Sequence, residues 1–71
     1  MTFVICLHNE GYEASLELRK IYQVLPPEEN DPHGYIRIVD EFGEDYLYNA
    51  KAFATVQLPP RIERKVGATL A

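Results

Sequence analysis

Cys6 and His8 are the first residues whose types and spacing could support chemistry. They lie two positions apart in an apolar segment, so on a strand they would share one face. Thiolate and imidazole both bind zinc, and a thiol beside an imidazole base is a nucleophile. A zinc site needs three or four ligands, but the other histidine, His33, lies in a polar loop and the chain has no second cysteine. The pattern therefore predicts a structural cysteine and a surface histidine, with no metal, no cofactor and no catalytic residue.

Acidic side chains occur as neighbouring pairs at Glu28-Glu29, Asp40-Glu41 and Glu44-Asp45. General acid–base catalysis requires opposed carboxylates whose surroundings separate their pKa values, and neighbours in a turn do not provide this. Residues 28–34 contain no apolar side chain and lack the spaced ligands of a calcium-binding loop. We therefore expect these carboxylates to serve solubility and turn formation, and we do not expect an enzyme.

The five tyrosines are the remaining candidates for function. Strand parity places Tyr22 and one of Tyr46 or Tyr48 in the core, together with Phe53 and the apolar residues Val24, Ile36 and Ile38. Tyrosine is enriched at interfaces because it combines a large apolar area with a polar tip. The competing interpretation is that the other tyrosines only cover the ends of the fold. The predicted partner-binding residues are Tyr12, Tyr35, Phe42 and Tyr48 with the acidic-loop residues Glu28, Glu29 and Asp31.

These residues must be positioned by short strands. Alternating apolar and polar residues, rich in β-branched and aromatic types, predict strands at five places. Between the third and fourth strands, Asp40 and Gly43 favour a tight turn, since Gly43 can adopt positive φ. Asn49 can cap a single helical turn over residues 50–53. The predicted strands cover residues 3–7, 21–25, 35–40, 45–48 and 54–58.

Two segments are open to more than one interpretation. Residues 13–20 fit an extended loop or half a strand, although good helix formers at helical spacing make a helix the rival. We favour the extended form because Gly11 precedes the segment and a strand follows it. Residues 59–71 fit a short helix from Pro60 to Gly67 with the last four residues frayed. Alternatively, the basic residues of this tail are unattached and contact the acidic body or a partner.

Composition indicates one small globular domain of 71 residues with a net charge of −4. Residues 1–50 hold ten acidic and three basic residues, whereas residues 51–71 hold one acidic and four basic. An acidic body repels phosphate, so nucleic-acid binding is not expected. The single cysteine favours a reducing compartment, and we expect the cytoplasm. The opening apolar segment lacks signal-peptide features and is far shorter than the roughly 20 residues that span a bilayer, so no membrane association is expected.

Residues 43–56, GEDYLYNAKAFATV, resemble the closing segment of SH3-like barrels, in which a hairpin strand leads through one 3₁₀ turn into the last strand. Residues 16–25 are similar to a strand entry in small bacterial and phage SH3-like proteins of uncharacterised function, which usually have Gly where this chain has Arg19. The resemblance implies a mainly β, partly open barrel of about five strands over residues 1–58, followed by the basic tail 59–71. The chain has no tryptophan and no Ala-Leu-Tyr-Asp-Tyr signature, so polyproline recognition is not implied.

Together these features predict a non-catalytic adaptor or regulatory module that binds a protein or peptide through exposed tyrosines and the acidic loop. The alternative is an acidic DNA mimic that occupies the basic groove of a nucleic-acid-binding protein. Edge strands in a partly open barrel can pair between copies, so a monomer and a weak homodimer are both consistent with the pattern.

Overall fold

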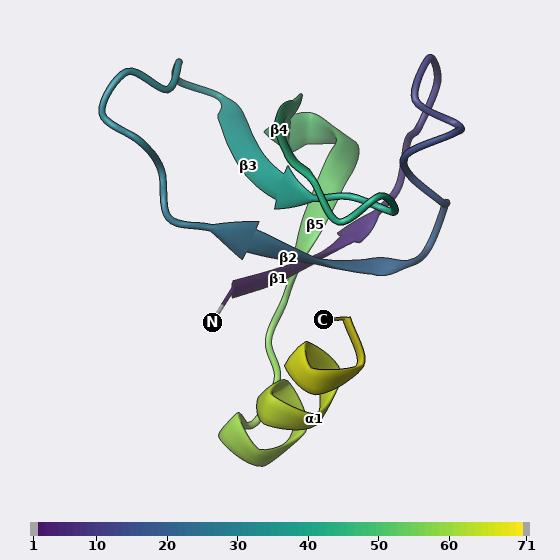
Figure 1. Ribbon diagram of the computed structural model, residues 1–71, viewed down its shortest axis with the longest axis vertical. Helices are drawn as coiled ribbons and strands as arrows, with labels where there is room; N and C mark the ends of the chain where they lie inside the picture. The colour runs from purple at the N-terminus through teal and green to yellow at the C-terminus, as the bar shows by residue number, and fades with distance from the viewer. Residues whose placement is uncertain (1, 71) are drawn as a thin grey trace.

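Five antiparallel strands form one sheet in the computed structural model, which describes residues 2–70. The strand order is β4-β3-β2-β1-β5, so β1, β2, β3 and β4 follow one another across the sheet, and β5 lies on the far side of β1 (Figure 1). This confirms the mainly β prediction. The strands are β1 (Thr2–Cys6), β2 (Ile21–Leu25), β3 (Tyr35–Val39), β4 (Asp45–Asn49) and β5 (Phe53–Val56).

The sheet does not close into a barrel. In the described part of the chain, β4 pairs only with β3 and β5 pairs only with β1. The 3₁₀ turn η1 (Ala50–Ala52) carries the chain between these two edges. As predicted, the Asn49 side chain caps η1, because its Oδ1 accepts from the backbone N–H of Lys51 at 2.9 Å. The observed structure is therefore an open five-stranded sheet, where the resemblance implies a partly open barrel.

The β3–β4 turn (residues 40–44) has the predicted chemistry. Gly43 adopts φ of +74°, and its N–H donates to the carbonyl of Asp40. The Asp40 carboxylate accepts from the backbone N–H of Phe42 at 2.9 Å and from that of Glu44 at 3.3 Å. These bonds fix the register in which Ile38 faces Tyr46 across the hairpin.

The core lies on the face of the sheet that carries the even-numbered residues of β1 to β4, because side chains alternate along a strand. Leu16, from the long loop between β1 and β2, is 1% exposed and packs into this core. The predicted inward positions of Tyr22, Ile38 and Phe53 are confirmed. The buried cluster consists of Val4, Cys6, Leu16, Tyr22, Ile38, Tyr48 and Phe53, with Val24, Ile36 and Ala52 packed against it.

The loop between β1 and β2 (residues 7–20) is a series of turns, so residues 13–20 form an irregular loop, as one interpretation expected, but not an extended one. The backbone N–H of Leu16 donates to the carbonyl of Tyr12, which makes one helical turn and no more. Asn9 then donates to the Leu16 carbonyl at 2.9 Å. Burial of Leu16 explains the difference, because the chain must fold back to place this side chain in the core.

The basic tail forms the helix α1 (Pro60–Leu70), which packs against β2 (Figure 1). The helix passes through Gly67, where the sequence predicted its end, and the Thr69 hydroxyl donates to the Val66 carbonyl in the segment predicted to fray. Ala71 lies outside the described residues. Within residues 2–70, no helix is long and apolar enough to cross a membrane.

Candidate partner-binding surface

Tyr12 and Tyr48 form the centre of the candidate site. Their ring centroids lie 5.2 Å apart with the planes at 81°, an edge-to-face contact. Tyr12 comes from the β1–β2 loop and Tyr48 from β4, so the pair joins two segments far apart in sequence. The Tyr48 ring also lies edge-on to Phe53, at 6.2 Å between centroids. Such pairs are worth about 0.5–1.5 kcal/mol beyond their area burial.

A groove of about 470 Å³ opens beside this pair, between the β1–β2 loop and the β3–β4 hairpin. Tyr12 and Phe42 on its rim are both more than half exposed. No Lys or Arg lines the groove among the described residues. We call this surface the aromatic groove; its lining residues are Tyr12, Ser15, Asp40, Phe42, Glu44, Tyr46, Leu47 and Tyr48.

A second, smaller hollow of about 260 Å³ lies on the other side of the Tyr12–Tyr48 pair. It shares both rings with the aromatic groove and adds Tyr35, which is exposed, and His8. Three of the four predicted aromatic residues, Tyr12, Tyr35 and Phe42, therefore lie on one aromatic surface that spans both hollows.

The fourth predicted residue, Tyr48, does not have the expected exposure. It is 5% exposed, whereas Tyr46 is 55% exposed. The two residues are two positions apart on β4 and so share a face, which means that strand parity could not separate them. Tyr48 pairs with Ile36 over the core, while Tyr46 pairs with Ile38 nearer the hairpin end. Tyr46 is therefore an exposed groove residue that the sequence interpretation missed.

Asp40 is the buried carboxylate of the aromatic groove, with 7% exposure. In addition to the two turn N–H groups, the hydroxyl of Tyr48 lies 3.4 Å from its Oδ2 and 3.2 Å from the Ser15 hydroxyl, so it can donate to either. Burial raises the pKa of Tyr48, which keeps this phenol a neutral donor. Asp40 forms no ion pair with any residue in the range 2–70.

Tyr22 and Glu41 hold the two walls of the groove together. The Tyr22 hydroxyl donates to Glu41 Oε2 and accepts from the backbone N–H of Glu17 at 2.8 Å. Lys20 adds an ion pair to Glu41 Oε1 at 2.7 Å. These donors lower the pKa of Glu41, the bond from Lys20 having the largest effect, and burial raises that of Tyr22. The backbone N–H of Glu41 also donates to the Ser15 carbonyl at 3.0 Å.

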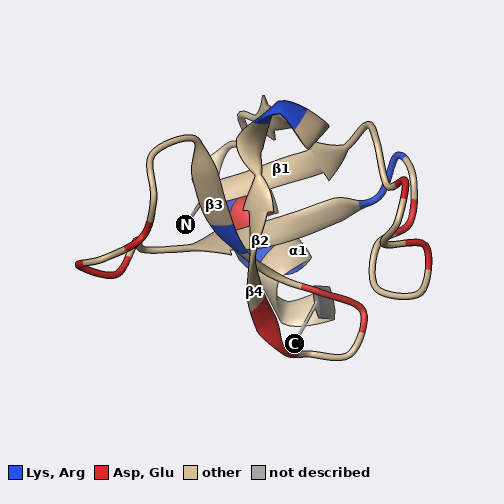
Figure 2. Ribbon diagram, turned by 90° about the horizontal axis from the view of Figure 1, so that it is seen from above, with Lys and Arg blue, Asp and Glu red and all other residues tan. Residues whose placement is uncertain are grey.

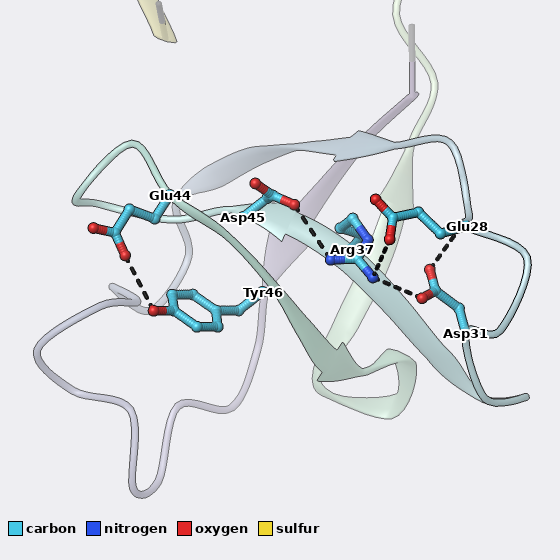
Figure 3. A network of polar contacts seen from close by, with 6 residues as sticks. All are labelled: Glu28, Asp31, Arg37, Glu44, Asp45 and Tyr46. Carbon is cyan, nitrogen blue, oxygen red and sulfur yellow. Dashed lines mark hydrogen bonds and ion pairs between the residues drawn. The ribbon is translucent and has the colours of Figure 1, made fainter.

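The predicted acidic-loop residues behave differently from the aromatic ones, because Arg37 on β3 binds two of them (Figure 3). Its Nη2 lies 2.6 Å from Asp31 and 3.3 Å from Glu28, and its Nη1 lies 3.3 Å from Asp45. The Arg37 guanidinium holds the pKa of Asp31 below its usual range. Glu29 has no ion pair in the described part of the chain. The acidic loop is thus anchored to the sheet, with much of its charge already compensated.

Cys6 and His8 do not form a reactive pair. The Cys6 side chain is fully buried, and its thiol donates weakly to the backbone carbonyl of His8, at 3.4 Å, and not to the imidazole. Burial raises the pKa of Cys6, which disfavours the thiolate needed by a nucleophile. Within the described residues, no cluster of three or more His, Cys, Asp or Glu side chains could hold a metal ion.

The acidic residues gather mainly in the loops and turns around the sheet, as Figure 2 shows. Comparison with protein-family models, with curated proteins and with solved structures gives no match to this chain. The candidate function is therefore argued from the aromatic groove itself.

Proposed function

We propose that this chain is a non-catalytic, SH3-like protein-binding module that binds its partner through the aromatic groove. The SH3-like assignment is supported by the order of strands, a meander from β1 to β4 followed by a 3₁₀ turn and a last strand beside β1. Fold resemblance alone does not define a function. The proposal depends on the exposed side chains.

The observation that carries the proposal is the grouping of Tyr12, Phe42 and Tyr46, each more than half exposed, around one groove. Scattered exposed aromatics are ordinary on a protein surface, but a contiguous group marks an interaction site. The edge-to-face contact with buried Tyr48 orients Tyr12, so little conformational entropy remains to be lost when a partner binds. Aromatic anchors of this kind dominate the energetics of many interfaces.

DNA mimicry is the weaker alternative because part of the acidic charge is already neutralised within the fold. Arg37 binds Glu28, Asp31 and Asp45, and Lys20 binds Glu41. A mimic depends instead on rows of carboxylates that remain available to a basic groove.

Affinity capture from nuclease-treated lysate tests the proposal when wild type is compared with a Tyr12→Ser, Tyr46→Ser double variant. Leu18→Ser is the matched control, since Leu18 is an exposed apolar residue outside the groove. We expect a protein that wild type and the control retain and the double variant loses. Equal capture by all three would exclude the groove as the binding surface. A partner released by added duplex DNA would favour mimicry.

A further inference from the structure

We propose that the aromatic groove is a receptor for a basic segment of another protein and binds the cationic head of a Lys or Arg side chain. This inference rests on the proposed function and names the chemistry of the partner. Three observations support it: the rings, the unpaired charge of Asp40 and the shape of the groove.

The rings supply the first argument. Tyr12, Phe42 and Tyr46 present exposed aromatic surface from two different segments, the β1–β2 loop and the β3–β4 hairpin. Aromatic faces attract an ammonium or guanidinium group, and the attraction grows as the cation is desolvated. The one exposed cation near an aromatic ring elsewhere in the described chain, Lys20 at 6.0 Å from the Tyr22 ring, lies outside the groove. Among the described residues, therefore, no cation lies over the groove rings.

Asp40 supplies the second argument. Buried charges are normally paired, and Asp31 and Glu41, whose side chains are each at most a quarter exposed, both pair with a cation. The side chain of Asp31 is 10% exposed and pairs with Arg37, and that of Glu41 is 25% exposed and pairs with Lys20. Asp40 is more buried than Glu41, yet no cation lies within 4 Å of it among residues 2–70. Asp40 lines the aromatic groove, which also contains Glu44, and a smaller hollow that it shares with Lys20.

The shape of the groove supplies the third argument. A volume of about 470 Å³ falls in the range of ligand sites and exceeds the needs of a single cationic head. The groove is open between the loop and the hairpin, so the rest of a peptide can continue along the surface. A neutral apolar peptide would leave Asp40 and Glu44 facing it without a charge partner, which is the reason a basic segment is favoured.

The binding test is a titration of ¹⁵N-labelled protein with penta-arginine, followed by NMR chemical shifts. Penta-citrulline is the matched probe, since citrulline has nearly the shape of arginine without the charge. We expect penta-arginine to shift the amides of residues 12–15 and 40–48 and penta-citrulline to bind at least tenfold more weakly. Equal binding of the two peptides, or shifts confined to the acidic loop, would overturn the proposal.

Asp40→Asn tests the charge while keeping the acceptor oxygen that the N–H groups of Phe42 and Glu44 use. We expect it to weaken penta-arginine binding about fivefold. Glu44→Gln, on the exposed rim, gives a second readout if the Asn variant folds poorly, and Glu29→Gln removes the same charge from the acidic loop. If Glu29→Gln weakens binding as much as the groove variants, the attraction is only a general effect of net charge and the proposal fails.

Two further outcomes separate the partner from its alternatives. If penta-arginine fails to bind while the Tyr12→Ser, Tyr46→Ser variant still loses a captured protein, the cation receptor is wrong and the binding module remains. If the isolated protein dimerises and Arg61→Ser with Arg64→Ser abolishes the dimer, the basic segment is α1 of a second copy, which overturns the assignment to another protein.

Discussion

The hydroxyl of Tyr22 donates to Oε2 of Glu41 at 2.5 Å and so ties β2 to the β3–β4 turn. The Tyr22 hydroxyl oxygen also accepts a hydrogen bond from the backbone N–H of Glu17, which brings in the β1–β2 loop. One phenol therefore joins the two segments that carry the rings of the aromatic groove. The groove is positioned by a residue that does not line it.

Replacing Tyr22 with Phe should lower the free energy of unfolding by about 1–2 kcal/mol, because two part-buried hydrogen bonds, from Glu17 and to Glu41, are lost. The ring remains in the core, so the fold should persist. Urea denaturation followed by circular dichroism measures the change. Tyr46→Phe is the control, since its hydroxyl donates only to the exposed Glu44 side chain and its loss should leave the free energy of unfolding nearly unchanged. Equal effects of the two substitutions would show that the Tyr22 hydroxyl does not hold the groove together.

Acid should weaken the fold through Glu41. Its pKa is lowered in the folded protein, so its contribution to stability is present above the ordinary glutamate value of about 4.3 and is lost as the pH falls through the lower folded value. Glu41→Gln should therefore reduce stability at pH 7 by less than about 1 kcal/mol, since solvent screens the pair, and should match wild type at the acidic end.

Urea denaturation of both proteins between about pH 7 and pH 3 checks this prediction. Glu29→Gln is the matched control because Glu29 has no ion pair in the described chain, and its curve should run parallel to that of wild type. A constant difference between Glu41→Gln and wild type across the whole range would show that the carboxylate contributes no titrating interaction.

Local sequence patterns were sufficient for most of the fold. β2 has the predicted bounds, and the turn at Gly43 and the cap at Asn49 were recognised because each depends on neighbours within a few residues. Alternation identified Tyr22 and Phe53 as core residues because a half-buried strand repeats every two positions.

The site was harder to predict, because it depends on contacts between distant segments. Tyr46 and Tyr48 share a face, and only their positions relative to the core decide which one is exposed. Asp31 looked available to a partner, but Arg37 lies six residues later and pairs with it. The path of the β1–β2 loop depends on where Leu16 is buried, which no local pattern specifies.

Arg19 is the one non-glycine residue with positive φ in the described chain, at +61°. This conformation costs an L-residue about 1–2 kcal/mol. Glycine avoids that cost, but it loses more backbone entropy on folding, which offsets about 0.5–1 kcal/mol of the gain. Arg19→Gly should therefore stabilise the protein by about 0.5–1 kcal/mol in urea denaturation. The side chain is exposed, and the backbone bond from its N–H to the Cys6 carbonyl is retained.

Gly43 provides the reverse test. A Cβ there would meet nothing within 4 Å, so Gly43→Ala should cost about 1 kcal/mol through φ alone, and Gly43→Asn should cost less because asparagine tolerates this region. If Arg19→Gly destabilises while Gly43→Ala behaves as expected, the Arg19 side chain contributes contacts that outweigh its backbone strain.

Deletion of residues 59–71 should leave the sheet and the aromatic groove intact, because the buried cluster draws on residues 4–53 alone. The helix α1 packs against β2, and its Val66 is half-buried, so loss of the helix should cost about 1–2 kcal/mol. Val66→Ala in the full chain is the control and should cost less than the deletion. NMR spectra of the shortened chain should superimpose on those of wild type at the groove residues. An unfolded shortened chain would show that the sheet needs the helix to cover its second face. In that case α1 is part of the domain, and the division of the chain after residue 58 is wrong.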